Sequence, residues 1–131
     1  MTTLRSLLPL ACALACALSP ARAAEPPQDF AAAKAAAVTD EASLDAPAKA
    51  ALVQAQRSLI DAGTSGCATA KPELSPFVIV MELGADGHVA KTWRQGDSLL
   101  SICMEHAMRD KTLIAPPRAP FYSLIEISFT K

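Results

Sequence analysis

The sequence has few aromatic residues, few glycines and no excess of charge of one sign, and each scarcity excludes a class of protein. Phe, Trp and Tyr make up 5% of the 131 residues, so the hydrophobic core must be small although 51% of the residues are apolar. Five glycines are too few for a collagen-like repeat and too scattered for a phosphate-binding loop. The formal net charge of −1 provides no field that would attract a polyanion. The length allows one compact domain.

The first 23 residues have the three-part pattern of a cleavable secretory signal peptide. Arg5 gives the basic start, residues 7–18 form an apolar run, and residues 21–23 read Ala-Arg-Ala, an Ala-x-Ala cleavage site. The apolar run is well short of the roughly 20 residues that span a bilayer, which disfavours the alternative of an uncleaved anchor. A lipidated Cys16 is a second alternative. The pattern predicts a signal peptide over residues 1–23, periplasmic localisation and no stable membrane insertion after cleavage.

Cleavage after Ala23 would change both the charge and the cysteine content of the chain. Removing 23 of 131 residues leaves 108, with 10 basic and 13 acidic side chains, which argues against nucleic acid as a partner. Only two of the four cysteines remain, and in an oxidising compartment they predict one disulfide between Cys67 and Cys103. The alternative is a pair of buried free thiols.

The first half of the mature chain predicts a tether followed by a helix. Residues 24–45 contain two prolines and an alanine tract with few large apolar side chains, which indicates a weakly helical, alanine-rich tether. Residues 46–62 carry apolar side chains at helical spacing after a capping Asp45, and Gly63 provides a stop. A loop that contains Cys67 follows.

The second half predicts a strand hairpin and its closing partners. Residues 77–83 are dense in β-branched and large apolar side chains, and Asp86-Gly87 can supply the positive φ of a tight reversal into a returning strand over residues 88–95. Val89 and Trp93 are expected to point to the same face of that returning strand.

A second helix and a last strand complete the predicted unit. The helix runs to about Lys111 with Asp97 as its cap, and Leu99 and Cys103 are expected to face inward. Residues 121–129 then alternate between a buried face and a partly solvated one. The predicted fold class is α+β, a small three-stranded antiparallel sheet with a helix packed on it (β-β-α-β) and an N-terminal helix before it, in a single domain over residues 46–131.

The side chains that usually carry chemistry are sparse and dispersed. His88 and His106 do not form a zinc-binding spacing, and pairing the two cysteines would leave no thiolate nucleophile. Glu82 and Glu126 lie on predicted strands, where solvent-facing positions are common. Trp93 could anchor an interface, although completion of the core is the commoner role. The sequence therefore predicts a protein that is not an enzyme and that has no cofactor and no metal.

Four motifs in the last 55 residues resemble the C-terminal domain of the TonB energy transducer and its stand-alone relatives. They are an apolar strand ending in Ala-Asp-Gly-His-Val at residues 85–89, a helix with Glu-His-Ala-Met-Arg at residues 105–109, the Pro116-Pro117 crossing, and the terminal strand at residues 125–129. A transducer proper has an uncleaved membrane helix, whereas this chain has a cleavable leader. The resemblance thus implies a fold and a mode of contact, and it does not imply force transmission.

In that family, the edge of the last strand receives an extended segment of a partner. The resemblance therefore implies strand addition along residues 121–129, with Tyr122, Leu124 and Glu126 as the candidate partner-binding edge. Coverage of this edge by the N-terminal helix, or by a second copy of the chain, is the alternative. The predicted function is an exported periplasmic binding or adaptor module for an envelope protein or peptide segment. The alternative function is a small periplasmic inhibitor or immunity-type protein that blocks an envelope enzyme.

Overall fold

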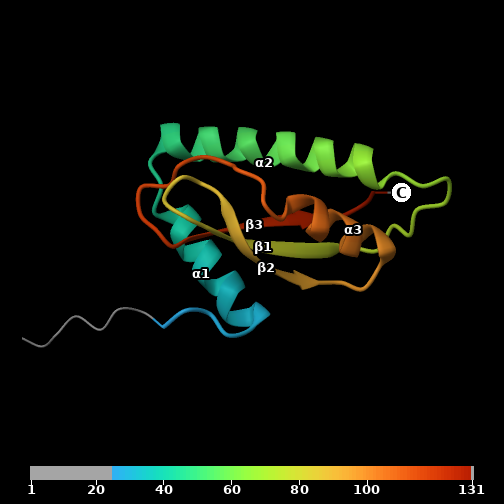
Figure 1. The fold of residues 1–131 in the computed structure, drawn as a ribbon, viewed down its shortest axis with the longest axis horizontal. Helices are drawn as coiled ribbons and strands as arrows, with labels where there is room; N and C mark the ends of the chain where they lie inside the picture. The colour runs from blue at the N-terminus through green and yellow to red at the C-terminus, as the bar shows by residue number, and fades with distance from the viewer. Residues whose placement is uncertain (1–24, 131) are drawn as a thin grey trace, which may run out of the picture.

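The computed structural model describes residues 25–130, which form a three-stranded sheet with helices on both faces (Figure 1). The predicted signal peptide at residues 1–23 lies outside the described residues. The elements follow in the order α1 (Phe30–Ala42), α2 (Ala46–Cys67), β1 (Phe77–Leu83), β2 (Val89–Gln95), α3 (Leu99–Met108) and β3 (Phe121–Ile127). The predicted α+β class with a three-stranded antiparallel sheet is confirmed, and two helices precede the sheet.

Strand β1 is the centre of the sheet because both of its faces are apolar. The strand order is β2-β1-β3, and both pairings are antiparallel. Six of the seven residues of β1 are buried, as expected for a strand covered on both sides. The two outer strands therefore form the two edges of the sheet.

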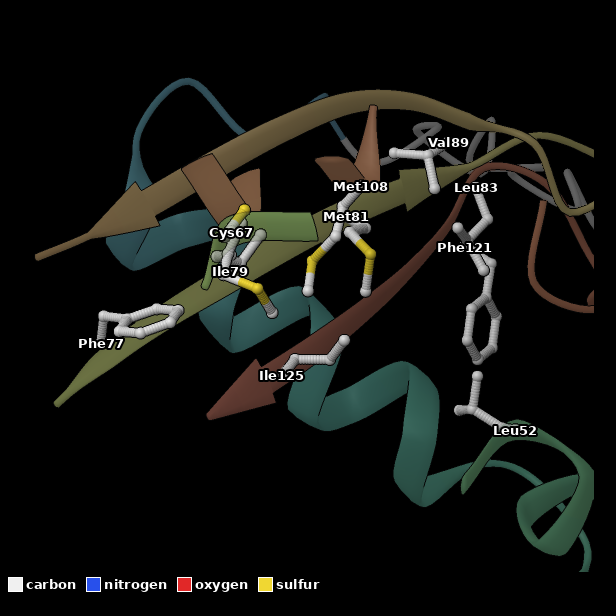
Figure 2. Close-up of a cluster of buried hydrophobic side chains, with 11 residues drawn as sticks. Leu52, Cys67, Phe77, Ile79, Met81, Leu83, Val89, Met108, Phe121 and Ile125 are labelled. Carbon is white, nitrogen blue, oxygen red and sulfur yellow. The ribbon is translucent and has the colours of Figure 1, made fainter. Parts of the chain in front are cut away.

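The main core lies between one face of the sheet and the helices α2 and α3. Phe77, Ile79, Met81 and Leu83 of β1 all face this core, as their alternation predicts. Figure 2 shows Phe121 of β3 extending from the sheet toward Leu52 of α2, within the same cluster of buried side chains.

Helix α1 covers the opposite face of the sheet at Val80 and Tyr122, which corrects the prediction of a tether, while the face remains partly solvated as predicted, because Leu124 is half-buried and Glu126 is exposed. Ala33 and Ala37 are fully buried and lie one turn apart, beside Val80 and Tyr122. Their small side chains let the helix backbone approach the strands closely. The alanine tract has few large apolar side chains, yet the surface of the sheet gives its small side chains a place to become buried.

Helix α2 continues past the predicted stop at Gly63 and ends at Cys67. Gly63 is buried, and a Cβ built there would lie 2.9 Å from the Sδ atom of Met104 in α3. The glycine therefore permits a close approach between two helices. A glycine inside a helix costs about 1 kcal/mol relative to alanine, which this packing offsets.

Helix α3 presents a different face to the core from the one predicted. Its cap is Ser98, whose Oγ accepts a hydrogen bond from the backbone of Ser101, and Asp97 is not the cap. Leu99 is 80% exposed and Cys103 is exposed, so the expectation that they face inward is wrong. The inward side chains are Ser101, Met104, Glu105 and Met108.

The disulfide between Cys67 and Cys103 is present, and it joins the end of α2 to the flank of α3. Cys67 is buried, whereas Cys103 is exposed because it lies on the side of α3 next to the end of α2 and not on the side that faces the core. Among residues 25–130, none of the helices combines the length and apolar character needed to cross a bilayer.

A bulge in the hairpin separates two side chains that were expected to share a face. The turn has the predicted positive φ at Gly87, 83°. The register then shifts between Glu82 and Leu83, so that β2 has one extra residue, Ala90. As a result Val89 packs in the main core, whereas Trp93 packs on the α1 face.

Candidate functional site

The predicted binding edge on β3 is already occupied along two of its three residues. The backbone N–H of Tyr122 donates to Oδ2 of Asp40 at 2.8 Å, and the N–H of Leu124 donates to Oε1 of Glu41 at 2.9 Å. Gln56 of α2 donates its amide to the Leu124 carbonyl at 3.0 Å. A guest strand could pair with this part of the edge only by displacing these side chains.

Helix α1 supplies both carboxylates from its last turn. Acidic side chains at a helix C-terminus are unfavourable to the helix dipole, so Asp40 and Glu41 are explained by their tertiary contacts and not by helix stability. Asp40 also forms an ion pair with Arg118. The alternative prediction was coverage of this edge by the helix over residues 46–62; that helix contributes Gln56, but both carboxylates come from the segment predicted to be a tether.

The three predicted edge side chains also differ in exposure. Tyr122 is 6% exposed and lies beneath α1, where its hydroxyl contacts Oε2 of Glu82 at 3.4 Å. Leu124 is half-buried, and Glu126 is exposed. Tyr122 and Leu124 are therefore not available to face a guest as predicted, and only Glu126 retains that exposure.

The other sheet edge, on β2, is open. Tyr122 and Leu124 direct their backbone N–H groups away from β1, so Val80, which lies opposite Leu124, does not bond to β3. In an antiparallel sheet, Val80 then bonds to Trp93 on β2. The backbone groups of the neighbouring Thr92 and Arg94 therefore point outward, away from the sheet. Within residues 25–130, no hydrogen bond occupies the backbone N–H and C=O groups of these two residues. Figure 1 shows β2 on the side of the sheet away from β3.

The open part of β2 begins where a short neighbouring segment ends. The N–H of Val89 donates to the Lys111 carbonyl at 2.8 Å, and the N–H of Leu113 donates to the Gly87 carbonyl at 3.0 Å. This segment covers the first residues of the strand only. Beyond it lies a groove of about 270 Å³, lined by Val89, Ala90, Lys91, Thr92, Arg109 and Asp110.

A buried carboxylate organises the α3 side of this edge. Glu105 accepts hydrogen bonds from Thr92 Oγ1 at 2.9 Å and from Arg94 Nε at 2.9 Å. Arg109, one turn along the helix, donates to it at 3.2 Å. Two guanidinium groups thus share one carboxylate, which leaves a local excess of positive charge beside the open backbone groups.

The network sets the ionisation of Glu105. Burial acts to raise its pKa, but hydrogen bonds from Thr92, Arg94 and Arg109, together with the charge of Arg109, outweigh burial and hold the pKa below its ordinary value of 4.5. The folded protein therefore favours the ionised form, and Glu105 stabilises the fold most strongly above its unfolded-state pKa.

We expect Glu105→Gln to lower the free energy of unfolding by about 2 kcal/mol at pH 7, the usual worth of hydrogen bonds to a charged group. Since the folded pKa is depressed, this difference should be constant above about pH 5 and should shrink as the pH falls through the folded pKa. Urea unfolding of both proteins between pH 2.5 and 7 measures it. Glu126→Gln, which changes the same groups at an exposed position, is the control variant. A pH-independent loss in Glu105→Gln would contradict the role assigned to its charge.

Trp93 gives the other face of the same edge an aromatic surface. Its ring lies half-buried with its centroid 6.0 Å from that of Tyr122, and the Lys91 ammonium lies 4.5 Å from the Trp93 centroid. The edge therefore has a polar, basic face toward α3 and an aromatic face toward α1.

Sequence reasoning predicted a binding edge on β3, where side chains bond to the outward backbone groups, and it did not single out the β2 edge. Two signals were available: polar Thr92 and Arg94 alternate on one face of a predicted strand, and Glu105 and Arg109 have the i, i+4 spacing of a helical ion pair. Neither signal shows that the four side chains meet. Within the part of the chain that the structure describes, no group of three or more metal-ligating side chains comes together.

Comparisons with protein-family models, with curated proteins and with solved structures return no match for this chain.

Proposed function

We propose that this chain is an exported periplasmic binding or adaptor module that holds an extended segment of an envelope protein by strand addition at the β2 edge. The observation that carries the proposal is the contrast between the two edges: side chains bond to the outward backbone groups of Tyr122 and Leu124, whereas those of Thr92 and Arg94 have no partner within residues 25–130. Natural proteins usually protect such edges unless they use them.

Export is the second part of the proposal. The Ala-x-Ala pattern at residues 21–23 supports cleavage after Ala23, and the disulfide between Cys67 and Cys103 is compatible with an oxidising compartment. We also propose that the likeness to TonB C-terminal domains is one of fold and of binding through a sheet edge, with the opposite edge used here. Mass spectrometry of the protein from a periplasmic fraction should find a mature N-terminus at Ala24.

Strand addition can be tested by removing one backbone donor from the open edge. The Thr92 N–H forms no ladder bond, so proline is sterically compatible with this edge position, and Thr92→Pro should fold. We expect it to reduce capture of the native envelope partner about tenfold, because a main-chain hydrogen bond is lost and the ring blocks the pairing. Capture on the immobilised mature protein, followed by quantitative mass spectrometry, measures this.

Thr92→Val is the matched control, because it loses the hydroxyl contact to Glu105 as the proline variant does but keeps the backbone donor. It should capture the partner as the parent protein does. Circular dichroism of both variants checks that the fold is intact. Equal capture by the proline and valine variants would show that the β2 edge is not the binding site.

A further inference from the structure

We infer that the segment bound at the β2 edge alternates acidic and apolar residues, with the acidic side chains toward α3 and the apolar side chains toward Trp93. This inference rests on the proposed function, because a strand added to β2 would direct its successive side chains to opposite faces of the sheet. The two faces beside β2 differ chemically, and each face limits which residue types the guest can have at every second position.

The α3 face selects for negative charge because some N–H donors of its two guanidinium groups have no hydrogen-bond partner within residues 25–130. Arg94 donates from Nε to Glu105 and from Nη1 to Ser101, and its Nη1 also pairs with Asp97. Arg109 donates from Nε to Thr92 and from Nη2 to Glu105. Nη2 of Arg94 and Nη1 of Arg109 have no partner within residues 25–130. A guest carboxylate beside Thr92 can accept from these donors, which Glu105 already holds in place.

The other acidic groups near this face do not cancel its charge. Asp97 is fully exposed and contacts Arg94 at 3.5 Å, where solvent weakens the pair. Asp110 lines the groove beside Arg109 and lies 3.6 Å from His88, but its side chain is 91% exposed, so solvent screens its charge. Glu105 balances one of the two guanidinium groups, so the other charge remains for a guest.

The α1 face selects for apolar side chains. Trp93 is the residue of β2 that lies between Thr92 and Arg94, so its side chain is directed to the opposite face from theirs. A guest side chain opposite Trp93 would lie within cross-strand contact distance of its ring, where aromatic and β-branched partners are the most favourable. Lys91 lies over the ring from the same strand and adds a third cation to Arg94 and Arg109 at this edge.

Charge also distinguishes this guest from the two occupants that the chain itself could provide. Two copies paired through β2 would bring Lys91, Arg94 and Arg109 of both copies to one interface, and such like charges repel. Residues 1–24 contain two arginines and no acidic residue, so they lack the charge that the α3 face requires. An acidic, alternating segment of another protein fits both faces.

Trp93 allows a direct binding test, because it is the chain's only tryptophan and lies at the site. The probe is a ten-residue peptide in which glutamate and valine alternate, titrated into the mature protein while Trp93 emission is recorded. The first control peptide replaces glutamate with lysine. The second has the same composition arranged as blocks, so that it cannot place all acids on one face. We expect the alternating acidic peptide to bind at least about tenfold more tightly than either control.

Variants of the protein assign the contact. Arg109→Gln should weaken binding of the acidic peptide about tenfold, whereas Arg109→Lys, which keeps the charge, should weaken it by less. Arg109 is half-exposed, so both variants are expected to fold. Equal affinity for the acidic and lysine peptides, or no effect of Arg109→Gln, would overturn the inference about charge. Equal affinity for the block peptide would overturn the inference about alternation.

The outcome also separates this inference from the proposed function. If Thr92→Pro reduces capture of the envelope partner as expected while the acidic peptide does not bind, strand addition is supported and the inferred chemistry of the guest is wrong. If Thr92→Pro has no effect on capture, both fail. Sedimentation that shows a dimer, converted to monomer by Thr92→Pro, would identify a second copy as the occupant and would overturn the acidic guest.

Discussion

Replacing both Cys67 and Cys103 with alanine is expected to lower the free energy of unfolding by about 3 to 4 kcal/mol. The two residues are 36 apart in sequence, so their bond removes much of the freedom of the loop and of β1 and β2 in the unfolded chain. The loss is large because a domain of this size is stabilised by only about 5 to 15 kcal/mol. Urea unfolding of the oxidised parent protein and the double variant measures the difference.

Reduction of the parent protein provides the matched control. The reduced parent should unfold near the urea concentration at which the double variant unfolds, because both lack the covalent link. Cys103 is exposed, so a small thiol reductant can reach the bond without global unfolding. Identical midpoints for the oxidised parent and the double variant would show that the link contributes nothing.

Gly87→Ala is the second large effect, with an expected loss of about 3 kcal/mol. Gly87 has a φ of 83°, which a residue with a side chain adopts only at a cost. A Cβ built at this position would also lie 2.2 Å from the carbonyl oxygen of Ile114, and a backbone atom cannot move aside as a side chain can. The variant should therefore separate the hairpin turn from residues 111–114. Thermal unfolding followed by circular dichroism measures the loss.

Gly66→Ala tests whether the effect at Gly87 depends on position or on glycine itself. Gly66 lies near the end of α2, and a Cβ built there meets no atom within 4 Å. Alanine is favoured over glycine in a helix, so this variant should be as stable as the parent or more stable by up to about 1 kcal/mol. A similar loss in both variants would contradict the role assigned to the contact with Ile114.

The hairpin shows how far local chemistry predicts this fold. The Asp-Gly pair predicted the positive φ at Gly87, and the dense β-branched sequence predicted β1 with its observed bounds, Phe77–Leu83. Both follow from the conformational preferences of neighbouring residues. The bulge at Ala90 does not, and it places Val89 and Trp93 on opposite faces of the sheet. Beside the bulge, the N–H of Val89 bonds to the carbonyl of Lys111, a residue that is distant in sequence.

The helices show the same division. The spacing of apolar residues predicted α2, but its extension to Cys67 depends on Met104 packing over Gly63. Helix α1 has few side chains that could form a core by themselves, and Ala33 and Ala37 become buried only because Val80 and Tyr122 of the sheet lie beside them. Small residues give a weak signal in sequence, because their effect is to let a helix approach another element closely. Whether such an element lies beside the helix is decided only by the tertiary structure.

The sequence by itself determined the class of the fold, the strand β1, the tight turn and the pairing of the cysteines, because each depends on local preference, alternation or the two cysteines left outside the predicted signal peptide. Only the tertiary structure decided which sheet edge is open. Asp40, Glu41 and Gln56 lie far from β3 in sequence, yet they bond to its outward backbone groups, while Glu105 draws Arg94 and Arg109 to the side of β2. Edge protection is made by side chains that meet only after folding, so no pattern within a strand reveals it.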